Sequence, residues 1–315
     1  MGLVLIVVLV LSSGVAIHVF EKLAGEMKIN KLFLATIMVG FSLSLPELAV
    51  GVASSLRGQP QIALGDIMGA NLANLSWIVG GAAMMAGTIS VVGDFWKKDL
   101  WVTIFLAILP FVMIIDGNLT RIDGLILLFV YLVYISGVVK NKDFLLNQAK
   151  IVGRKPVAQR LKNKTNWFGY LLGLVVSVAV LAFSAWNLID LAISMSSSLG
   201  VSVFWVGLLI ISFATTLPEL MLSILIFEKQ KISLVLADIL GSVVVNSTLI
   251  LGMVAVISPI HYGESIQKGV AGVFLVVILG LFWIFTQSKR KLERWEGIVL
   301  VGFYAMFVGL EFLLV

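Results

Sequence analysis

The chain contains no cysteine and very little charge. Only 12% of its 315 residues are Asp, Glu, Lys or Arg, about half of the share found in soluble domains. The lack of cysteine excludes disulfide-stabilised folds, thiolate metal sites and thiol redox chemistry. The scarcity of charge argues against a soluble enzyme and against a nucleic-acid-binding module, although the net charge is +5.

The residues that are present are mostly apolar. Hydrophobic residues make up 60% of the chain and the mean hydropathy is +1.10, more apolar surface than a soluble core of this size could bury. A membrane-spanning helix needs about 20 apolar residues. The sequence predicts an all-α polytopic membrane protein with ten spans near residues 2–20, 32–56, 62–92, 99–115, 122–139, 167–188, 203–227, 233–258, 267–287 and 296–314.

Basic residues predict the orientation of these spans. Nineteen of the 22 Lys and Arg residues fall in one set of alternate loops, and the other three are Arg57, Arg121 and Lys268. Because cytoplasmic loops are enriched in Lys and Arg, we expect the larger set to be cytoplasmic in the cell membrane and both termini to be outside. The basic segment 140–166 is then a cytoplasmic linker, and setting topology is favoured over lipid binding as its role.

An internal repeat relates the two halves of the chain. Residues 41–48 (FSLSLPEL) and 213–220 (FATTLPEL) correspond at an offset of 172, which also pairs Asp66 with Asp238 and Asn74 with Asn246. Five spans in each half give the halves opposite orientations, so the repeat is inverted. We expect a first repeat at 1–139 with its motif at 40–80, and a second at 167–315 with its motif at 212–252.

Two carboxylates are predicted to lie deep in the membrane. Glu47 and Glu219 fall near the centres of spans two and seven, directly after Pro46 and Pro218, which interrupt helices. A carboxylate at this depth marks an ion or proton pathway, and the predicted spans contain no Lys or Arg to neutralise it except Lys268, which is the second residue of span nine. A bound cation or a proton is therefore the expected counter-charge.

Helical spacing gathers further oxygen ligands around these carboxylates. Acid and amide residues share one stripe of span three and the equivalent stripe of span eight, and hydroxyl residues precede each proline. Oxygen ligands suit Ca²⁺, Mg²⁺, Na⁺ or H⁺ and disfavour Zn²⁺ or copper. The candidate ligands are Glu47, Glu219, Ser44, Thr215, Thr216, Asn74, Asn246, Ser242, Asp66 and Asp238.

Other roles stay open for several of these residues. Glu47 and Glu219 could be structural hydrogen-bonded carboxyls, and the asparagines Asn74 and Asn246 could join neighbouring helices. Asp66 and the equivalent Asp238 could instead cap the first turns of spans three and eight, which would place them at a shallower depth.

The paired segments GFSLSLPEL…ALGDIMGANLANL and SFATTLPEL…VLADILGSVVVNSTLILG resemble the two α-repeats of the cation/Ca²⁺ antiporter superfamily, specifically a prokaryotic Na⁺/Ca²⁺ exchanger. The resemblance covers nearly the whole chain. It implies antiport by alternating access, with Ca²⁺ on Glu47 and Glu219 and with the hydroxyl and amide candidates completing the site.

Five positions depart from the pattern that the resemblance implies. Leu43 and Ala70 replace hydroxyl residues, Asn246 stands where Asp is frequent, and an acid stands at 66 and at 238 where Asn is common. Since the missing hydroxyls belong to sodium sites in the family, the coupling ion is left open between Na⁺ and H⁺.

These observations favour a secondary active antiporter that exchanges Ca²⁺ for Na⁺. The alternatives are antiport with H⁺ or of another divalent cation and, more remotely, a cation channel or a membrane protein with a structural cation. We expect no enzymatic activity, no cofactor beyond the transported ions and no nucleic-acid partner. The sequence leaves stoichiometry, divalent selectivity and oligomeric state undetermined.

Overall fold

A computed structural model describes residues 2–26, 44–90, 95–140, 167–228, 233–261, 266–289 and 291–314. Over these residues the protein is a bundle of helices with two short two-stranded ladders. Eight helices are long and apolar enough to cross a membrane, and two shorter apolar helices span Leu45–Leu56 and Leu100–Asp116. Each of these ten segments falls within or overlaps one predicted span, although residues 32–43 of the second predicted span lie outside the described residues. An all-α polytopic membrane architecture is confirmed.

The first half contains five helical segments, the third of which is lengthened by a π-helical turn. A 3₁₀ turn, η2, follows the fourth. Its elements are α1 (Gly2–Glu26), α3 (Leu45–Leu56), α4 (Pro60–Ala73), η1 (Asn74–Ile78), α5 (Val79–Ala86), β1 (Thr88–Ser90), α6 (Phe95–Met113), η2 (Ile114–Asp116), β2 (Asn118–Leu119) and α7 (Arg121–Lys140).

The second half repeats this order, with π-helical turns at η4 and η5. Its elements are α9 (Trp167–Leu199), α10 (Val203–Trp205), η4 (Val206–Ile211), α11 (Ser212–Thr215), α12 (Leu217–Glu228), α13 (Ser233–Val244), η5 (Val245–Ile250), α14 (Leu251–Ile257), β3 (Ile260–His261), α15 (Ile266–Lys289), β4 (Lys291–Glu293) and α16 (Arg294–Leu313).

Helix α9 shows where the predicted boundaries were wrong. Its expected end was near residue 188, but the helix continues to Leu199 and is 33 residues long in total. The last turns are rich in serine, and Ser194, Ser197 and Ser198 donate hydrogen bonds to carbonyls one turn earlier. Because these hydroxyls bond within the helix, the polar stretch stays helical. Residues 141–166 of the predicted linker lie outside the described residues.

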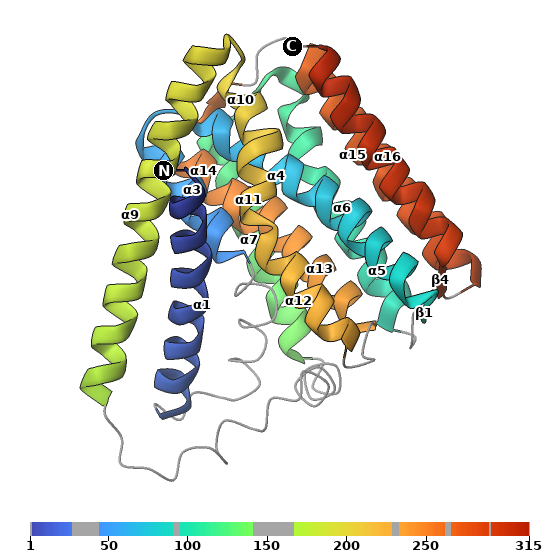
Figure 1. The fold of residues 1–315 in the computed structure, drawn as a ribbon, viewed down its shortest axis with the longest axis horizontal. Coiled ribbons are helices and arrows are strands. Elements are labelled where there is room, and N and C mark those ends of the chain that lie inside the picture. The colour runs from blue at the N-terminus through green and yellow to red at the C-terminus, as the bar shows by residue number, and fades with distance from the viewer. Residues whose placement is uncertain are drawn as a thin grey trace.

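The most buried helix is at the centre of the bundle. In the most apolar 18-residue stretch of Pro60–Ala86, which is formed by α4, η1 and α5, 94% of the residues are buried, whereas the share is 22% in the corresponding stretches of α1 and of α9. Helices α1 and α9 pack side by side along one edge of the molecule (Figure 1). Their outer faces expose large apolar side chains, including Leu3 and Phe168, and are suited to contact lipid acyl chains.

Contacts between the halves follow the repeat found in the sequence. A Cβ on Gly80 would meet the carbonyl oxygen of Gly297 at 2.7 Å, and a Cβ on Gly124 would meet that of Gly252 at 2.8 Å. The repeat offset pairs Gly80 with Gly252, and an offset one residue larger pairs Gly124 with Gly297. The antiparallel ladder β1–β4 corresponds to β3–β2 in the same way. Helix α5 therefore packs against α16, the last helix of the second half, and the equivalent α14 packs against α7, the last helix of the first half.

Candidate cation site

The two prolines begin helices at the centre of the bundle. Pro46 lies in the first turn of α3, after Ser44, and Pro218 lies in the first turn of α12. A turn at Thr216 separates α11 from α12. Matching backbone bonds start both helices: Leu48 donates to the carbonyl of Ser44 at 2.9 Å, and Leu220 donates to that of Thr216 at 3.1 Å. In the second half, the predicted interruption of the helix before Pro218 is therefore confirmed.

The carboxylates that follow these prolines are buried together with a third acid. Glu47 and Asp66 are 0% exposed and Glu219 is 1% exposed. Helix α3, which carries Glu47, packs against α4, which carries Asp66, and α12, which carries Glu219, packs against η1 at the end of α4. Burial of three acids in one region is costly unless cations or hydrogen-bond donors compensate it.

Asp66 connects the two halves of the protein. The Thr215 hydroxyl donates a 2.8 Å hydrogen bond to its Oδ1 atom, and its Oδ2 atom has no hydrogen-bond partner within the described structure. The alternative role as a helix cap is wrong, because α4 begins at Pro60 with Gln59 as its N-cap. Asp66 is fully buried and lies beside the helix break at Thr216, while its depth in the membrane stays a prediction.

The equivalent Asp238 is only partly described. It is the sixth residue of α13, which begins at Ser233, so it cannot be the N-cap of this helix. Its side chain lies outside the described part of the structure. Whether it ligates an ion stays a prediction.

Close packing of α4 against the second half brings Asp66 to Thr215. A Cβ on Gly65 would overlap the backbone of α10 and η4, and a Cβ on Gly69 would overlap the Leu208 carbonyl and the Ser212 side chain. Glycine at these two positions lets the helices approach closely. The contact between Asp66 and Thr215 depends on this approach.

The symmetric asparagines lie in the two π-helical turns η1 and η5. Asn74 and Asn246 are both 0% exposed. Neither side-chain atom of Asn74 has a hydrogen-bond partner within the described structure, so no bond supports a role in joining helices. Asn246 donates a 3.3 Å bond to Oδ1 of Asn71 and does join η5 to α4, while its own oxygen is unpartnered. π-Helical turns often occur at functional sites.

Asn71 was not identified from the sequence. It is fully buried, and its Nδ2 atom donates a 2.9 Å hydrogen bond to the Ser247 hydroxyl. The repeat pairs Asn71 with Val243, so a search for symmetric polar residues passes over it. The available signal was its place on α4 between Asp66 and Asn74.

The hydroxyl candidates are also buried near the helix breaks and on α13. The side-chain oxygens of Ser44 and Ser242 have no hydrogen-bond partner among the described residues. Thr216 donates a 2.8 Å bond to the carbonyl of Ser212, and its oxygen retains lone pairs that can accept or ligate. Ser212, which was not among the candidates, bonds back to the Leu208 carbonyl.

Among the described residues, carboxylates alone do not form a complete set of ligands for a metal ion. Among the described residues, no three His, Asp or Glu side chains converge closely enough to hold a metal ion. A cation held here would need hydroxyl, amide or backbone oxygens as well as carboxylates. Hard cations such as Ca²⁺ and Na⁺ accept such mixed oxygen ligands.

Comparison with known proteins identifies the family. The family described as sodium/calcium exchanger protein matches residues 1–140 and 169–313. The chain belongs to this family. It is therefore a multi-pass membrane protein of a transporter family rather than an enzyme family, as expected from the sequence.

Individual members of the sodium/calcium exchanger family resemble the chain over nearly its full length. The putative antiporter CaxA of Alkalimonas amylolytica is 27% identical, with 99% of this chain and 97% of that protein covered. The sodium/calcium exchanger MaX1 of Methanosarcina acetivorans is 24% identical, with 98% and 96% covered. The solved sodium–calcium exchanger NCX_Mj has the same fold, with a TM-score of 0.63, 23% identity and 98% and 95% covered. These relatives support cation/Ca²⁺ antiport at a coarse level.

Proposed function

We propose that the protein exchanges Ca²⁺ for Na⁺ across the membrane by alternating access. The observation that carries the proposal is the burial of three carboxylates, those of Glu47, Glu219 and Asp66, the last of which accepts a hydrogen bond from Thr215 at the helix break of the second half. Apart from Lys268 at the start of span nine, the predicted spans contain no Lys or Arg. Bound cations therefore offset the free-energy cost of burying these carboxylates.

The ligand set proposed for these ions combines both halves. Glu47 and Glu219 supply the main charge for Ca²⁺, and the unpartnered oxygens of Ser44, Asn74 and Ser242 complete its coordination. Ca²⁺ takes six to eight oxygen ligands in flexible geometry, which agrees with the lack of a closed carboxylate cage among the described residues. Thr215, Thr216, Asn246, Asp66 and Asp238 supply the remaining oxygens for the ions.

The charge balance favours Na⁺ as the coupling ion. Two glutamates balance one Ca²⁺ ion or two protons, and three Na⁺ ions would exceed their charge. The bond from Thr215 places Asp66 in the same buried centre. With this third carboxylate, three Na⁺ ions can be neutralised.

Coupling to H⁺ is the second candidate. It is favoured by Leu43 and Ala70, which stand where the family resemblance implies hydroxyl ligands for Na⁺. Without these hydroxyls, carboxylates could accept protons in place of Na⁺. The two candidates predict different driving gradients.

Uptake of ⁴⁵Ca²⁺ into proteoliposomes at clamped voltage tests both candidates. An outward Na⁺ gradient should drive uptake, and a pH gradient without Na⁺ should not. Uptake driven only by the pH gradient would favour H⁺ coupling. Flux that is independent of either gradient would contradict antiport and indicate a channel, and competition by Mg²⁺ or Mn²⁺ would define the divalent selectivity.

A further inference from the structure

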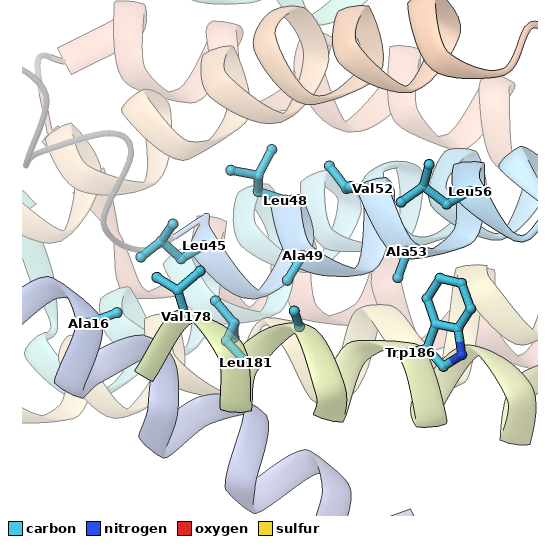
Figure 2. A pocket seen from close by; sticks show the side chains of 11 residues that line it. Ala16, Leu45, Leu48, Ala49, Val52, Ala53, Leu56, Val178, Leu181 and Trp186 are labelled. Carbon is cyan, nitrogen blue, oxygen red and sulfur yellow. The ribbon is translucent and has the colours of Figure 1, made fainter. Parts of the chain in front are cut away.

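An apolar cavity of about 280 Å³ lies between α3, α9 and α1, outside the candidate cation site. Figure 2 shows Ala49 and Ala53 of α3 pointing toward α9, with Trp186 at one end of the space. The lining residues are Ala16, Leu45, Leu48, Ala49, Val52, Ala53, Leu56, Val178, Leu181, Ala182 and Trp186.

The cavity and the cation site lie on different faces of α3. The lining residues of this helix, from Leu45 to Leu56, recur at spacings of three and four and form one stripe. Glu47 and Ser54 are buried on the other side. An occupant of the cavity would therefore contact the helix that carries Glu47 without contacting Glu47 itself.

The chemistry of the lining excludes water and polar ligands. The indole nitrogen of Trp186 is the one polar side-chain atom among the lining residue types. A buried water needs two to four polar partners, and apolar cavities of this kind stay dry or take up apolar molecules. Hydrocarbon is the chemical class that fits.

The cavity runs from buried side chains to the apolar exterior. Ala53 and Leu181 are each 5% exposed, whereas Leu56, Val178 and Trp186 are 61%, 48% and 39% exposed. In a multi-pass membrane protein these exposed apolar residues face lipid. A hydrocarbon chain can enter from the bilayer without crossing polar surface.

A charged group stands at the Trp186 end of the cavity. The Arg57 guanidinium lies 4.1 Å from the centroid of the Trp186 ring and pairs with Asp190. Its side chain is 32% exposed, and its five donors exceed what one carboxylate oxygen accepts. Arginine binds phosphate by such spare donors. The Trp186 end of the cavity, where Arg57 lies, is its mouth. A phosphate-binding guanidinium at the mouth and an apolar lining inside together match a phospholipid.

The cavity exists because three positions carry alanine. At the repeat offset, Ala49, Ala53 and Ala182 correspond to Met221, Leu225 and Val10. All three equivalent side chains are larger than alanine. The alanines at this cavity are therefore not shared by the two repeats, and the cavity is not required by the shared helix plan.

We propose that this cavity binds one acyl chain of a membrane phospholipid whose phosphate is held by Arg57. The bound chain occupies the space between α3 and α9. The proposal is independent of the identity of the transported ions.

Photolabelling tests the proposal in the intact protein. The protein is placed in nanodiscs that contain phosphatidylcholine with a diazirine in one acyl chain, and adducts are mapped by mass spectrometry. We expect adducts on the buried residues Ala53 and Leu181 as well as on exposed residues such as Phe129 of α7, which is 66% exposed. Adducts confined to exposed residues would overturn the proposal.

A cavity-filling variant adds a second comparison. The triple variant Ala49→Met, Ala53→Leu, Ala182→Val introduces the residues found at the equivalent positions of the other repeat and should lower labelling at Leu181 at least fivefold, with labelling at Phe129 unchanged. Ala305→Met, on an exposed part of α16, is the matched control and should label as the wild type does. Equal labelling at Leu181 in the triple variant would contradict the proposal.

Two variants at the mouth test the phosphate contact and need no change in the cavity. Arg57→Gln should lower phospholipid labelling at Leu181 about threefold. Asp190→Asn removes the ion pair but keeps the guanidinium, so labelling should be unchanged or higher. Equal loss in both variants would contradict phosphate binding, and labelling by a diazirine fatty acid but not by the phospholipid would overturn the choice of ligand.

Discussion

The hydroxyl of Thr215 donates a 2.8 Å hydrogen bond to the Asp66 carboxylate, which joins the helix break of the second half to the central helix of the first. At the repeat offset the equivalent residues are Leu43 and Asp238. Leucine has no hydroxyl, so this bond cannot be repeated there. The candidate site is thus asymmetric in a protein whose fold is built from two related halves.

The first prediction concerns this bond. Asp66→Asn removes one negative charge with almost no change in shape, and we expect the Na⁺ concentration for half-maximal exchange to rise about tenfold, equivalent to about 1.4 kcal/mol. Thr215→Val should have a smaller effect in the same direction. Na⁺ titration of Ca²⁺ flux in proteoliposomes measures both.

The double variant Asp66→Asn, Thr215→Val is the internal control. Because the two residues share one bond, their effects should not add. Strict additivity would show that the bond has no role in ion binding, and unchanged Na⁺ dependence in Asp66→Asn would remove Asp66 from the site.

The second prediction concerns the symmetric glutamates. Glu47→Gln or Glu219→Gln should reduce Ca²⁺ flux at least about 100-fold, because even residues outside the first ligand shell change metal affinity 10–100-fold. Glu311→Gln is the control, since Glu311 is also 0% exposed but lies at the other end of α16 from the first-turn Glu296. Wild-type flux in either glutamine variant at 47 or 219 would disprove the assignment.

The third prediction concerns the contact between α5 and α16. A Cβ on Gly80 would lie 2.7 Å from the Gly297 carbonyl oxygen and 3.0 Å from the Val301 side chain. Gly80→Ala should therefore destabilise the protein by about 1–3 kcal/mol through overpacking. The adjacent Gly81 has open space, so Gly81→Ala should be neutral or slightly stabilising. Thermal unfolding in detergent compares them, and equal melting temperatures would refute the close approach.

The fourth prediction concerns Asn71. Its replacement by Val, the residue at the equivalent position 243, removes the bonds to Ser247 and Asn246. Leaving buried polar partners unsatisfied costs about 1–3 kcal/mol each, so both thermal stability and Ca²⁺ affinity should fall. Asn187→Ala on the exposed face of α9 is the control and should change stability by less than about 0.5 kcal/mol. Wild-type Ca²⁺ affinity in Asn71→Val would limit this residue to a structural role.

The repeat made much of the fold predictable. Apolar stretches predicted ten spans, matching positions such as Gly80 with Gly252 and Pro46 with Pro218 predicted a duplication, and five spans in each half predicted that the repeat is inverted. Boundaries were less predictable: α9 runs to Leu199 because its serines bond to their own backbone. The π-helical turns at Asn74 and Asn246 have no signal in hydrophobic spacing, since that spacing reports on exposure and not on which carbonyl each amide bonds.

The sequence by itself determined that the protein spans the membrane and that it carries acids where no basic side chain can neutralise them. Both follow from composition and spacing, because lipid requires long apolar helices and makes buried charge costly. The tertiary structure decided that Asp66 is bonded to Thr215, that Asn71 bonds to Ser247, and that alanines leave a cavity beside α3. These features arise between helices far apart in the chain. Their close approach depends on glycine contacts such as those at Gly65 and Gly69, whose partners are set by packing.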